Sequence, residues 1–301
     1  RGLGDVYKRQ SLTPLVSDRD QNFKITEGEK SHIFKIANSA ESRSVLEMQN
    51  SALNYKSKKD DSIEIPQPVK TIDGHDILSI ESASTKYHAR LLTYVDGVFL
   101  KDVKLTNGTT FSVGKFLGYL DKGLVGFYHR AAKREFIWDV SQVSLLESNL
   151  TKDDFDLITF FINSFKHDIS SLMNDFPKTI IHNDGNDHNI LVDSLNRVKG
   201  IIDFGDMIHS FRVIEPSVAM AYIAIEDNNF ELIASLIKGY HSIVPLSLDE
   251  LYAAFYFMCL GWFVIIGGGG NLRRGMGSCL LYTSDAADEG LGVDLGGRRI
   301  I

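Results

Sequence analysis

The sequence lacks the features that mark several large classes of protein. Its 301 residues include only 2 cysteines, too few for a disulfide framework. No apolar run reaches the roughly 18 residues that a membrane-spanning helix needs. Lys and Arg number 32 against 39 Asp and Glu, a formal net charge of −7, and no basic tract offers a surface for nucleic-acid phosphates. We therefore expect a cytoplasmic protein with no membrane or nucleic-acid partner.

Both ends of the chain lack the character of evolved protein sequence. Asp5–Gln10 (DVYKRQ) and Cys279–Ser284 (CLLYTS) can be back-translated into DNA segments that are nearly reverse complements of each other. Such an inverted repeat resembles the transposon end used in sequencing libraries. We interpret residues 1–10 and 279–301 as translated adapter sequence and leave them out of the fold prediction.

The remaining residues change character near residue 95. Before it, short apolar runs surround one helical stripe, and the predicted strands and helix are Phe23–Thr26, His32–Ala37, Ser42–Tyr55 (the helix), Asp76–Ser82 and Ala89–Val95. After it, helical spacing dominates, and the predicted helices are Thr110–Tyr128, Phe155–Leu172 with a capping box at Thr151 and Asp154, Val213–Ile225, Phe230–Tyr240 and Leu248–Ile266. Short apolar runs at Thr179–Ile181, Ile190–Val192 and Val198–Ile202 interrupt these helices. We predict an α+β protein with a sheet-rich part at 11–95 and a helix-rich part at 96–278.

One segment between the predicted helices carries a dense set of polar residues. His182, Asp184 and Asn189 form the pattern H-x-D-x-x-x-x-N, and Ile202–Asp206 (IDFGD) ends the next apolar run. Phosphoryl transfer uses a carboxylate to deprotonate the acceptor hydroxyl, and oxygen ligands to hold Mg²⁺ against the nucleotide phosphates. The two motifs contain these groups and indicate a phosphotransferase.

The two motifs resemble the catalytic and metal-binding loops of the aminoglycoside phosphotransferase and choline kinase superfamily. Further segments, Ser17–Phe23 (SDRDQNF), Leu91–Gly97 (LLTYVDG) and Arg134–Asp139 (REFIWD), look most like the hydroxylysine kinase branch of that superfamily. The resemblance implies a bilobal protein-kinase-like fold, with a small antiparallel-sheet N-lobe that binds nucleotide and a helix-rich C-lobe. It also implies Asp184 as the catalytic base, with Asn189 and Asp203 as Mg²⁺ ligands.

The resemblance also assigns residues to the phosphoryl donor, ATP or GTP. Lys35 matches the lysine that holds the nucleotide phosphates, and Glu47 matches its ion-pair partner, although the two residues could also form a surface pair. The chain has no G-x-G-x-x-G loop. Further phosphate contacts are therefore expected from the turn at 18–22, through Asp20, Gln21 and Asn22.

The acceptor implied by the resemblance is a small amino alcohol, with 5-hydroxylysine as the best match. Choline, ethanolamine, homoserine and aminoglycosides stay open as alternatives. Asp187, Asp206, Arg212 and Glu215 are the candidate acceptor-binding residues, and their acidic majority suits a cationic acceptor. They could equally form a salt-bridged loop.

Two other readings of the polar segment stay open. His182, Asp184, Asp187 and His188 could bind a transition metal in a hydrolase, although their spacing lacks the H-E-x-x-H or H-x-H patterns that bring two imidazoles to one ion. The chain could also be an inactive kinase-like module that binds nucleotide without turnover. His182 itself either takes part in the chemistry or braces the loop.

Overall fold

The computed structural model of the chain describes residues 10–17, 19–59, 63–82, 85–148, 155–227 and 229–267. The two interpreted adapter segments, apart from Gln10, lie outside these residues, as do Asp18 and the predicted capping box. Two compact units make up the structure. The first contains the residues up to Asn50 and Pro66–Tyr94, and the second contains Ser51–Ile65 and Val95–Gly277.

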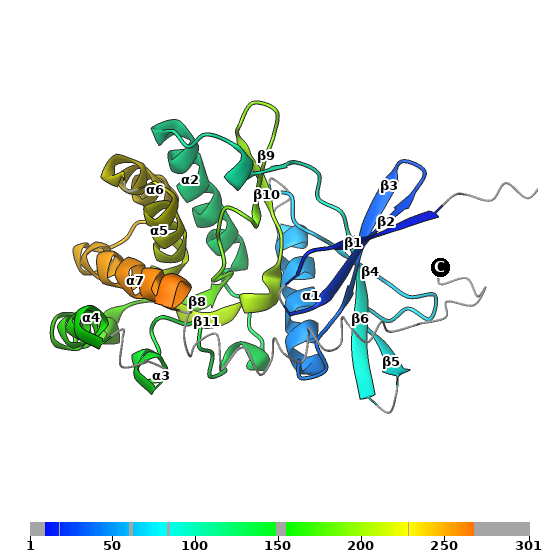
Figure 1. Cartoon of the computed structure of the whole chain (residues 1–301), viewed down its shortest axis with the longest axis horizontal. Helices are drawn as coiled ribbons and strands as arrows, with labels where there is room; N and C mark the ends of the chain where they lie inside the picture. Colours follow the sequence, from blue (N-terminus) through cyan, green and yellow to red (C-terminus); the bar gives the residue numbers. More distant parts are fainter. Residues whose placement is uncertain are drawn as a thin grey trace, which may run out of the picture. The chain divides into compact units, whose positions relative to one another are not determined.

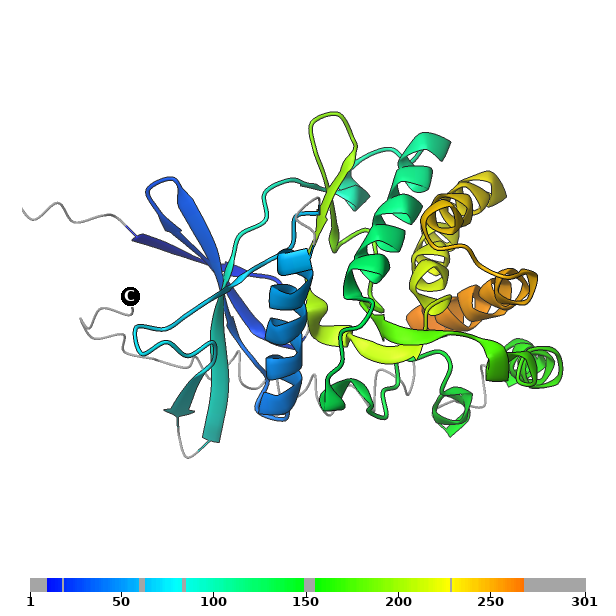
Figure 2. The same cartoon turned by 180° about the vertical axis from the view of Figure 1, so that it is seen from behind.

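An antiparallel sheet forms the first unit. Its strands follow the order β1-β2-β3-β6-β4, and β5 also pairs with β6. Figure 2 shows these strands in blue to cyan. Their bounds are β1 Gln10–Leu15, β2 Gln21–Glu27, β3 Lys30–Ile36, β4 Pro68–Val69, β5 Leu78–Ser82 and β6 Thr85–Thr93. Gly28 takes a φ of +60° in the turn between β2 and β3, a conformation that glycine adopts without strain.

Helix α1, Arg43–Lys59, corresponds to the predicted helix at Ser42–Tyr55, and the division between the units falls within it, after Asn50. Its first half is held to the sheet by Arg90 of β6. The guanidinium of Arg90 donates to Asn50 Oδ1 at 3.1 Å and to the side chain of Gln49. All three side chains are buried, so these bonds satisfy polar groups that would be costly to leave unpaired.

Helices make up most of the second unit (Figure 1). The longer ones are α2 Asn107–Leu124, α4 Phe155–Asp168, α5 Ile214–Glu226, α6 Phe230–Ile243 and α7 Leu248–Gly267, and α3 Val143–Ser148 is short. Helices α2 and α6 pack closely because glycines occupy both sides of their contact. A Cβ added at Gly114 would overlap the carbonyl oxygen of Leu236, and one added at Gly239 would overlap that of Phe111.

Two small antiparallel sheets in the second unit carry the polar motifs. One has the order β10-β9-β7 and the other pairs β11 with β8. The bounds are β7 Val98–Phe99, β8 Lys178–Ile181, β9 Ile190–Val192, β10 Val198–Ile201 and β11 Ile208–Phe211. The first motif therefore lies in the loop from β8 to β9, and the second lies between β10 and β11.

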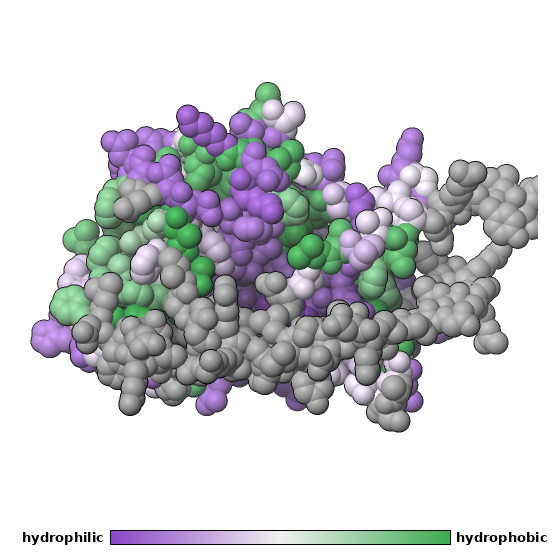
Figure 3. Space-filling view, in the orientation of Figure 1, coloured by the Kyte–Doolittle hydropathy of each residue, from purple (hydrophilic) through white to green (hydrophobic). Residues whose placement is uncertain are grey.

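Helix α7 is the one described helix long and apolar enough to span a membrane, by length and composition only. Of its apolar stretch Leu248–Ile265, 56% is buried inside the structure, which is typical of a core helix. Figure 3 shows hydrophobic side chains at the surface in the region of α7, where Leu248, Tyr252 and Phe255 are exposed.

Candidate active site

Asp184 lies at the centre of a hydrogen-bonded loop between β8 and β9. The side-chain amide of Asn186 donates to Asp184 Oδ1 at 2.6 Å, and that of Asn189 donates to Asp184 Oδ2, also at 2.6 Å. The Asn189 amide also donates to the Asp184 carbonyl at 3.0 Å. Both carboxylate oxygens are thus held, and the carboxylate has a fixed orientation.

The surroundings of Asp184 favour its protonated form. Burial raises its pKa well above the ordinary value, and the negative charges of Asp206 and Asp203 raise it further. The amides of Asn186 and Asn189 act in the opposite direction, because they stabilise the ionised form. A carboxylate whose pKa is raised toward neutrality is a stronger proton acceptor once it is ionised.

His182 lies inside the protein and joins parts of the loop through its ring nitrogens. Its side chain is fully buried, and burial lowers its pKa to about 4, so the imidazole is neutral. Nε2 lies 3.1 Å from the carbonyl oxygen of Ile202, to which it donates, and Nδ1 accepts from the backbone N–H of Asp184 at 3.3 Å. Its ring also packs edge-on against Phe204, at 4.6 Å between centroids. The histidine therefore joins the two motifs to each other.

Asp203, the second residue of the IDFGD motif, has a left-handed backbone conformation, with a φ of +60°. Its Oδ1 accepts from the backbone N–H of Gly205 at 3.3 Å. Arg134 fixes the turn that follows, because its guanidinium donates to the carbonyls of Gly205 and Met207 at 2.9 and 3.1 Å. The unusual φ at an aspartate indicates a backbone held in place by its surroundings.

The residues around Asp203 suit Mg²⁺ by their chemistry. The ion prefers oxygen ligands and keeps several waters, so few protein ligands are needed. The amide nitrogen of Asn189 donates to Asp184, so its amide oxygen is available to coordinate a cation. Asp203 adds a carboxylate in a region where Asp184 and Asp206 repel each other's charge. A cation would relieve that repulsion. No group of three or more His, Cys, Asp or Glu in the described residues forms a cluster fit for a metal.

The first unit brings together most of the residues predicted to bind nucleotide. Asn22 and Lys35 are direct cross-strand partners in β2 and β3, and Gln21 pairs with Ile36 beside them. Asp20 Oδ2 lies 3.8 Å from Lys35 Nζ, while Asp20 Oδ1 accepts from the backbone N–H of Asn38 at 3.2 Å. The side chain of Lys35 is 8% exposed, so a nearby carboxylate is needed to offset the cost of burying its charge.

The predicted ion pair between Lys35 and Glu47 is wrong. Glu47 lies on an exposed face of α1, where its carboxylate accepts from Arg43 Nε at 2.9 Å. Asp20 places a carboxylate oxygen 3.8 Å from Lys35 Nζ. The physical reason is the spacing of α1, because Arg43 and Glu47 are four residues apart and therefore adjacent on the helix surface.

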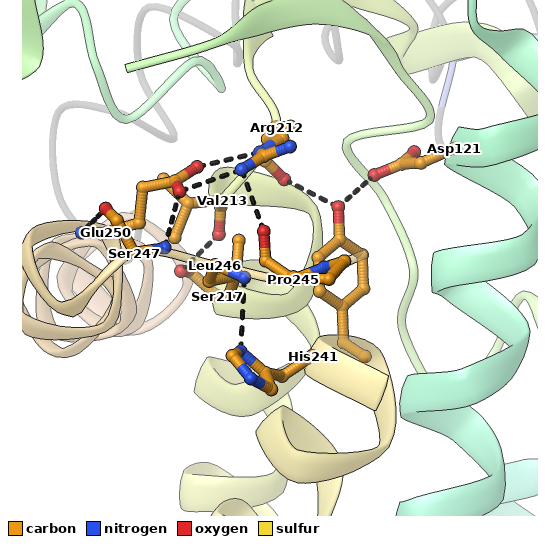
Figure 4. A network of polar contacts seen from close by, with 10 residues as sticks. Asp121, Arg212, Val213, Ser217, His241, Pro245, Leu246, Ser247 and Glu250 are labelled. Atoms are coloured by element: carbon orange, nitrogen blue, oxygen red, sulfur yellow. Dashed lines mark hydrogen bonds and ion pairs between the residues drawn. The ribbon is translucent and has the colours of Figure 1, made fainter. Parts of the chain in front are cut away.

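Arg212 was predicted to shape the acceptor site, and the structure places it in a different network (Figure 4). Its guanidinium donates through Nε and Nη2 to both oxygens of Glu250, at 2.8 and 2.9 Å, and to the carbonyl of Pro245 at 2.9 Å. Its carbonyl accepts from the hydroxyl of Tyr240, which also donates to Asp121 at 2.6 Å. Arg212 is thus a structural link between α5, α6 and α7.

Glu215 is also not available to an acceptor, since its side chain is completely buried. Its Oε2 accepts from the backbone N–H of Asn183 at 2.9 Å, while its buried Oε1 has no hydrogen-bond partner among the described residues. Burial raises its pKa to about 7. Asn183 has a φ of +63°, so Glu215 supports a strained point of the loop just before Asp184.

Of the remaining acceptor candidates, Asp206 lies near Asp184 and Asp187 lines a pocket beside the loop. Sequence reasoning missed Asn186 and Tyr222. Asn186 donates to Asp184 and lies beside the hydroxyl of Tyr222 on α5. Asn186 stands within the polar segment and could have been found there. Tyr222 carries no local signal because only the fold brings α5 to the loop.

The comparisons agree with this geometry. The family model described as the phosphotransferase enzyme family matches residues 11–251. A hydroxylysine kinase from Mus musculus is 28% identical over 282 residues, covering 84% of this chain and 75% of that protein. One from Xenopus laevis is 31% identical over 283 residues, covering 82% and 74%.

Solved structures share the fold. An aminopropanol kinase associated with a microcompartment has a TM-score of 0.68 at 19% identity, covering 99% of this chain and 96% of that one. An amicoumacin kinase solved in complex with AMP-PNP, Ca²⁺ and Ami has a TM-score of 0.69 at 15% identity, covering 93% of this chain and 88% of that one. These likenesses confirm the predicted α+β, protein-kinase-like fold. By its sequence match the chain belongs to the phosphotransferase enzyme family and is a kinase that acts on a hydroxyl group.

Proposed function

We propose that the chain transfers the γ-phosphoryl group of ATP or GTP to the hydroxyl of 5-hydroxylysine. The main support for the proposal is the pair of hydrogen bonds that the side-chain amides of Asn186 and Asn189 donate to Asp184 in the H-x-D-x-x-x-x-N loop. We call this pair the amide clamp. The acceptor is proposed from the hydroxylysine kinases to which the chain is similar over more than four-fifths of its length.

In this proposal Asp184 takes the proton of the acceptor hydroxyl as the oxygen attacks phosphorus. The clamp from Asn186 and Asn189 fixes the carboxylate, so no side-chain reorientation is needed during proton transfer. His182 and Glu215 act on the backbone of the loop and hold Asp184 in place.

Lys35 is proposed to hold the phosphates of the donor nucleotide, with Asp20 keeping the lysine charged and oriented. Asn22 stands opposite Lys35 in the β2–β3 hairpin and could donate to the phosphates through its side-chain amide nitrogen; its buried Oδ1 has no hydrogen-bond partner among the described residues. Asn189 and Asp203 are the proposed ligands of Mg²⁺, which when bound would neutralise charge on the nucleotide phosphates.

The test is release of nucleoside diphosphate by the purified protein with Mg²⁺, ATP or GTP, and a panel of hydroxylysine, choline, ethanolamine, homoserine and kanamycin. Asp184→Asn should lower hydroxylysine-dependent release by about 10²- to 10⁴-fold while nucleotide binding persists. Asp249→Asn, an exposed change in the first turn of α7, serves as the matched control and should leave release unchanged.

Full activity of Asp184→Asn would contradict the assigned base. Release of diphosphate with another acceptor, and none with hydroxylysine, would support the kinase activity but show that hydroxylysine is not the acceptor. A folded protein that binds nucleotide but shows no release with any acceptor would favour the inactive binding module.

A further inference from the structure

A pocket of about 210 Å³ opens beside the loop that carries Asp184, entirely within the second unit. Gly185 and Asp187 of that loop form part of its wall. Gly185 directly follows Asp184 in the chain, and Tyr222, which also lines the pocket, lies beside Asn186, the residue that donates to Asp184, so this end of the pocket is near the proposed base although Asp184 itself does not line it. The volume is below the roughly 300–1,000 Å³ of drug-sized ligand sites and suits a molecule of amino-acid size.

Most of the pocket wall is apolar. Aliphatic side chains come from the segment after β7 and from α2, α5 and α6, namely Leu100, Val103, Val113, Ile223 and Leu236. Such a surface contacts methylene groups favourably and offers nothing to a densely hydroxylated sugar. The ligand should therefore have an aliphatic chain between its polar ends.

Two lysines give the pocket a cationic side. Lys101 and Lys104 both line it, and both are exposed. Among the described residues, neither lysine has a carboxylate within ion-pair distance. The backbone N–H of Lys101 donates to the carbonyl of Asp187 at 3.1 Å, which ties the lysine segment to the proposed catalytic loop. Two positive charges at a fixed place beside the loop favour an anionic group on the ligand.

The pocket also has an acidic side. Asp187 in the loop, and Glu226 and Asp227 at the end of α5, all line it. The side chain of Asp187 is only 13% exposed and accepts from His188 at 3.0 Å. Carboxylates of this kind favour an ammonium group. A ligand with charges of both signs would satisfy both sides of the pocket.

We propose that this pocket is the acceptor site and that it selects amino alcohols carrying a carboxylate, which Lys101 and Lys104 bind while Asp187 and Glu226 bind an ammonium group. This inference rests on the proposed function and extends it. Cations without a carboxylate, such as choline, ethanolamine or aminoglycosides, would leave the two lysines unpaired and would meet their repulsion.

The test uses the full chain and two acceptors that differ only in the carboxylate, 5-hydroxylysine and 1,5-diaminopentan-2-ol. Replacing both lysines by methionine (Lys101→Met with Lys104→Met) should raise KM for hydroxylysine about tenfold or more and leave KM for nucleotide unchanged. KM for the diamine should not rise. Lys122→Met, at an exposed lysine late in α2, is the matched control and should change neither value.

The acidic side is tested by Glu226→Gln, which should raise KM for both acceptors because both carry ammonium groups. Glu231→Gln on the exposed start of α6 is its control. Equal effects of the double lysine change on both acceptors, or no effect on hydroxylysine, would overturn the inference.

Failure of the proposed function gives different results. If the wild-type protein turns over choline, ethanolamine or kanamycin in preference to hydroxylysine, the kinase stands and this inference is wrong. If no acceptor is turned over, calorimetric binding of hydroxylysine decides. Binding that the double lysine variant loses supports the inference without the kinase reaction, and absence of binding to the wild type overturns both.

Discussion

Glu215 is a completely buried carboxylate that accepts the backbone N–H of Asn183, the residue just before the proposed catalytic base. Its pKa is raised to about 7 from an ordinary value of 4.5 because burial penalises the charged form. The folded state then holds a proton that the unfolded state releases between pH 4.5 and 7. This carboxylate therefore lowers the stability of the fold as pH rises through that window, and has no further effect above it.

Glu215→Gln should remove this pH dependence. The amide oxygen of glutamine can still accept the N–H of Asn183, and the side chain cannot ionise. From pH 4.5 to 7 the wild type should lose on the order of 3 kcal/mol of unfolding free energy relative to the variant. Chemical denaturation of both proteins across this range measures the difference. Parallel curves would mean that Glu215 ionises in the folded protein as it does in the unfolded one.

The residues of the site differ in how far the sequence could specify them. Asp184, Asn189 and Asp203 lie in a recognisable pattern, and in the structure the side-chain amide of Asn189 donates to Asp184. Glu215 and Arg212 were predicted either to contact the acceptor or to form a salt-bridged loop. In the structure Arg212 pairs with Glu250 and Glu215 accepts from the backbone of Asn183, and partners of that kind have no signature in a single sequence.

At the scale of elements, the contact between α2 and α6 depends on the absence of side chains. Gly114→Ala would place a methyl group against the carbonyl oxygen of Leu236, and the backbone of α6 would have to shift to make room for it. We expect a loss of about 1–3 kcal/mol or more in unfolding free energy, as for other overpacked cores. Denaturant unfolding measures it.

Gly108→Ala provides the matched control in the same helix. Gly108 is exposed in the first turn of α2, and its added Cβ would meet only the Thr106 side chain at 3.7 Å, an ordinary contact. Alanine favours a helix over glycine by up to about 1 kcal/mol, so this variant should be unchanged or slightly more stable. Equal losses at both positions would refute the packing explanation.

The elements themselves were largely predictable where an apolar repeat is long. The spacing from Phe155 predicts α4, although the structure ends that helix at Asp168 and gives Leu172 to a short 3-10 turn. Strands without such a repeat were missed. β7 has only two residues, too few for a pattern. β11, Ile208–Phe211, contains the polar residues His209 and Ser210, and β11 is a strand because it pairs with β8.

At the scale of the whole molecule, the sequence predicts the fold class correctly because strand-rich and helix-rich patterns occupy separate stretches of the chain. The structure divides the chain differently in one place, since Ser51–Ile65 belongs to the second unit. That assignment follows from contacts such as the hydrogen bond from Tyr55 to the carbonyl of Val125 at 2.9 Å. A contact across 70 residues cannot be inferred from local pattern.

The interpretation of the two ends as translated adapter makes a prediction for the whole chain. Every residue of the described core lies between Ala37 and Val264, and the first described strand begins at Gln10. A protein spanning residues 10–278 should therefore unfold within about 2 °C of the full chain, a shift that corresponds to about 1 kcal/mol in a protein of this size. Its acceptor-dependent activity should also be unchanged. Calorimetry and the diphosphate-release assay on both proteins decide the matter, because a clearly lower Tm or lost turnover in the shorter protein would mean that the ends contribute to the fold.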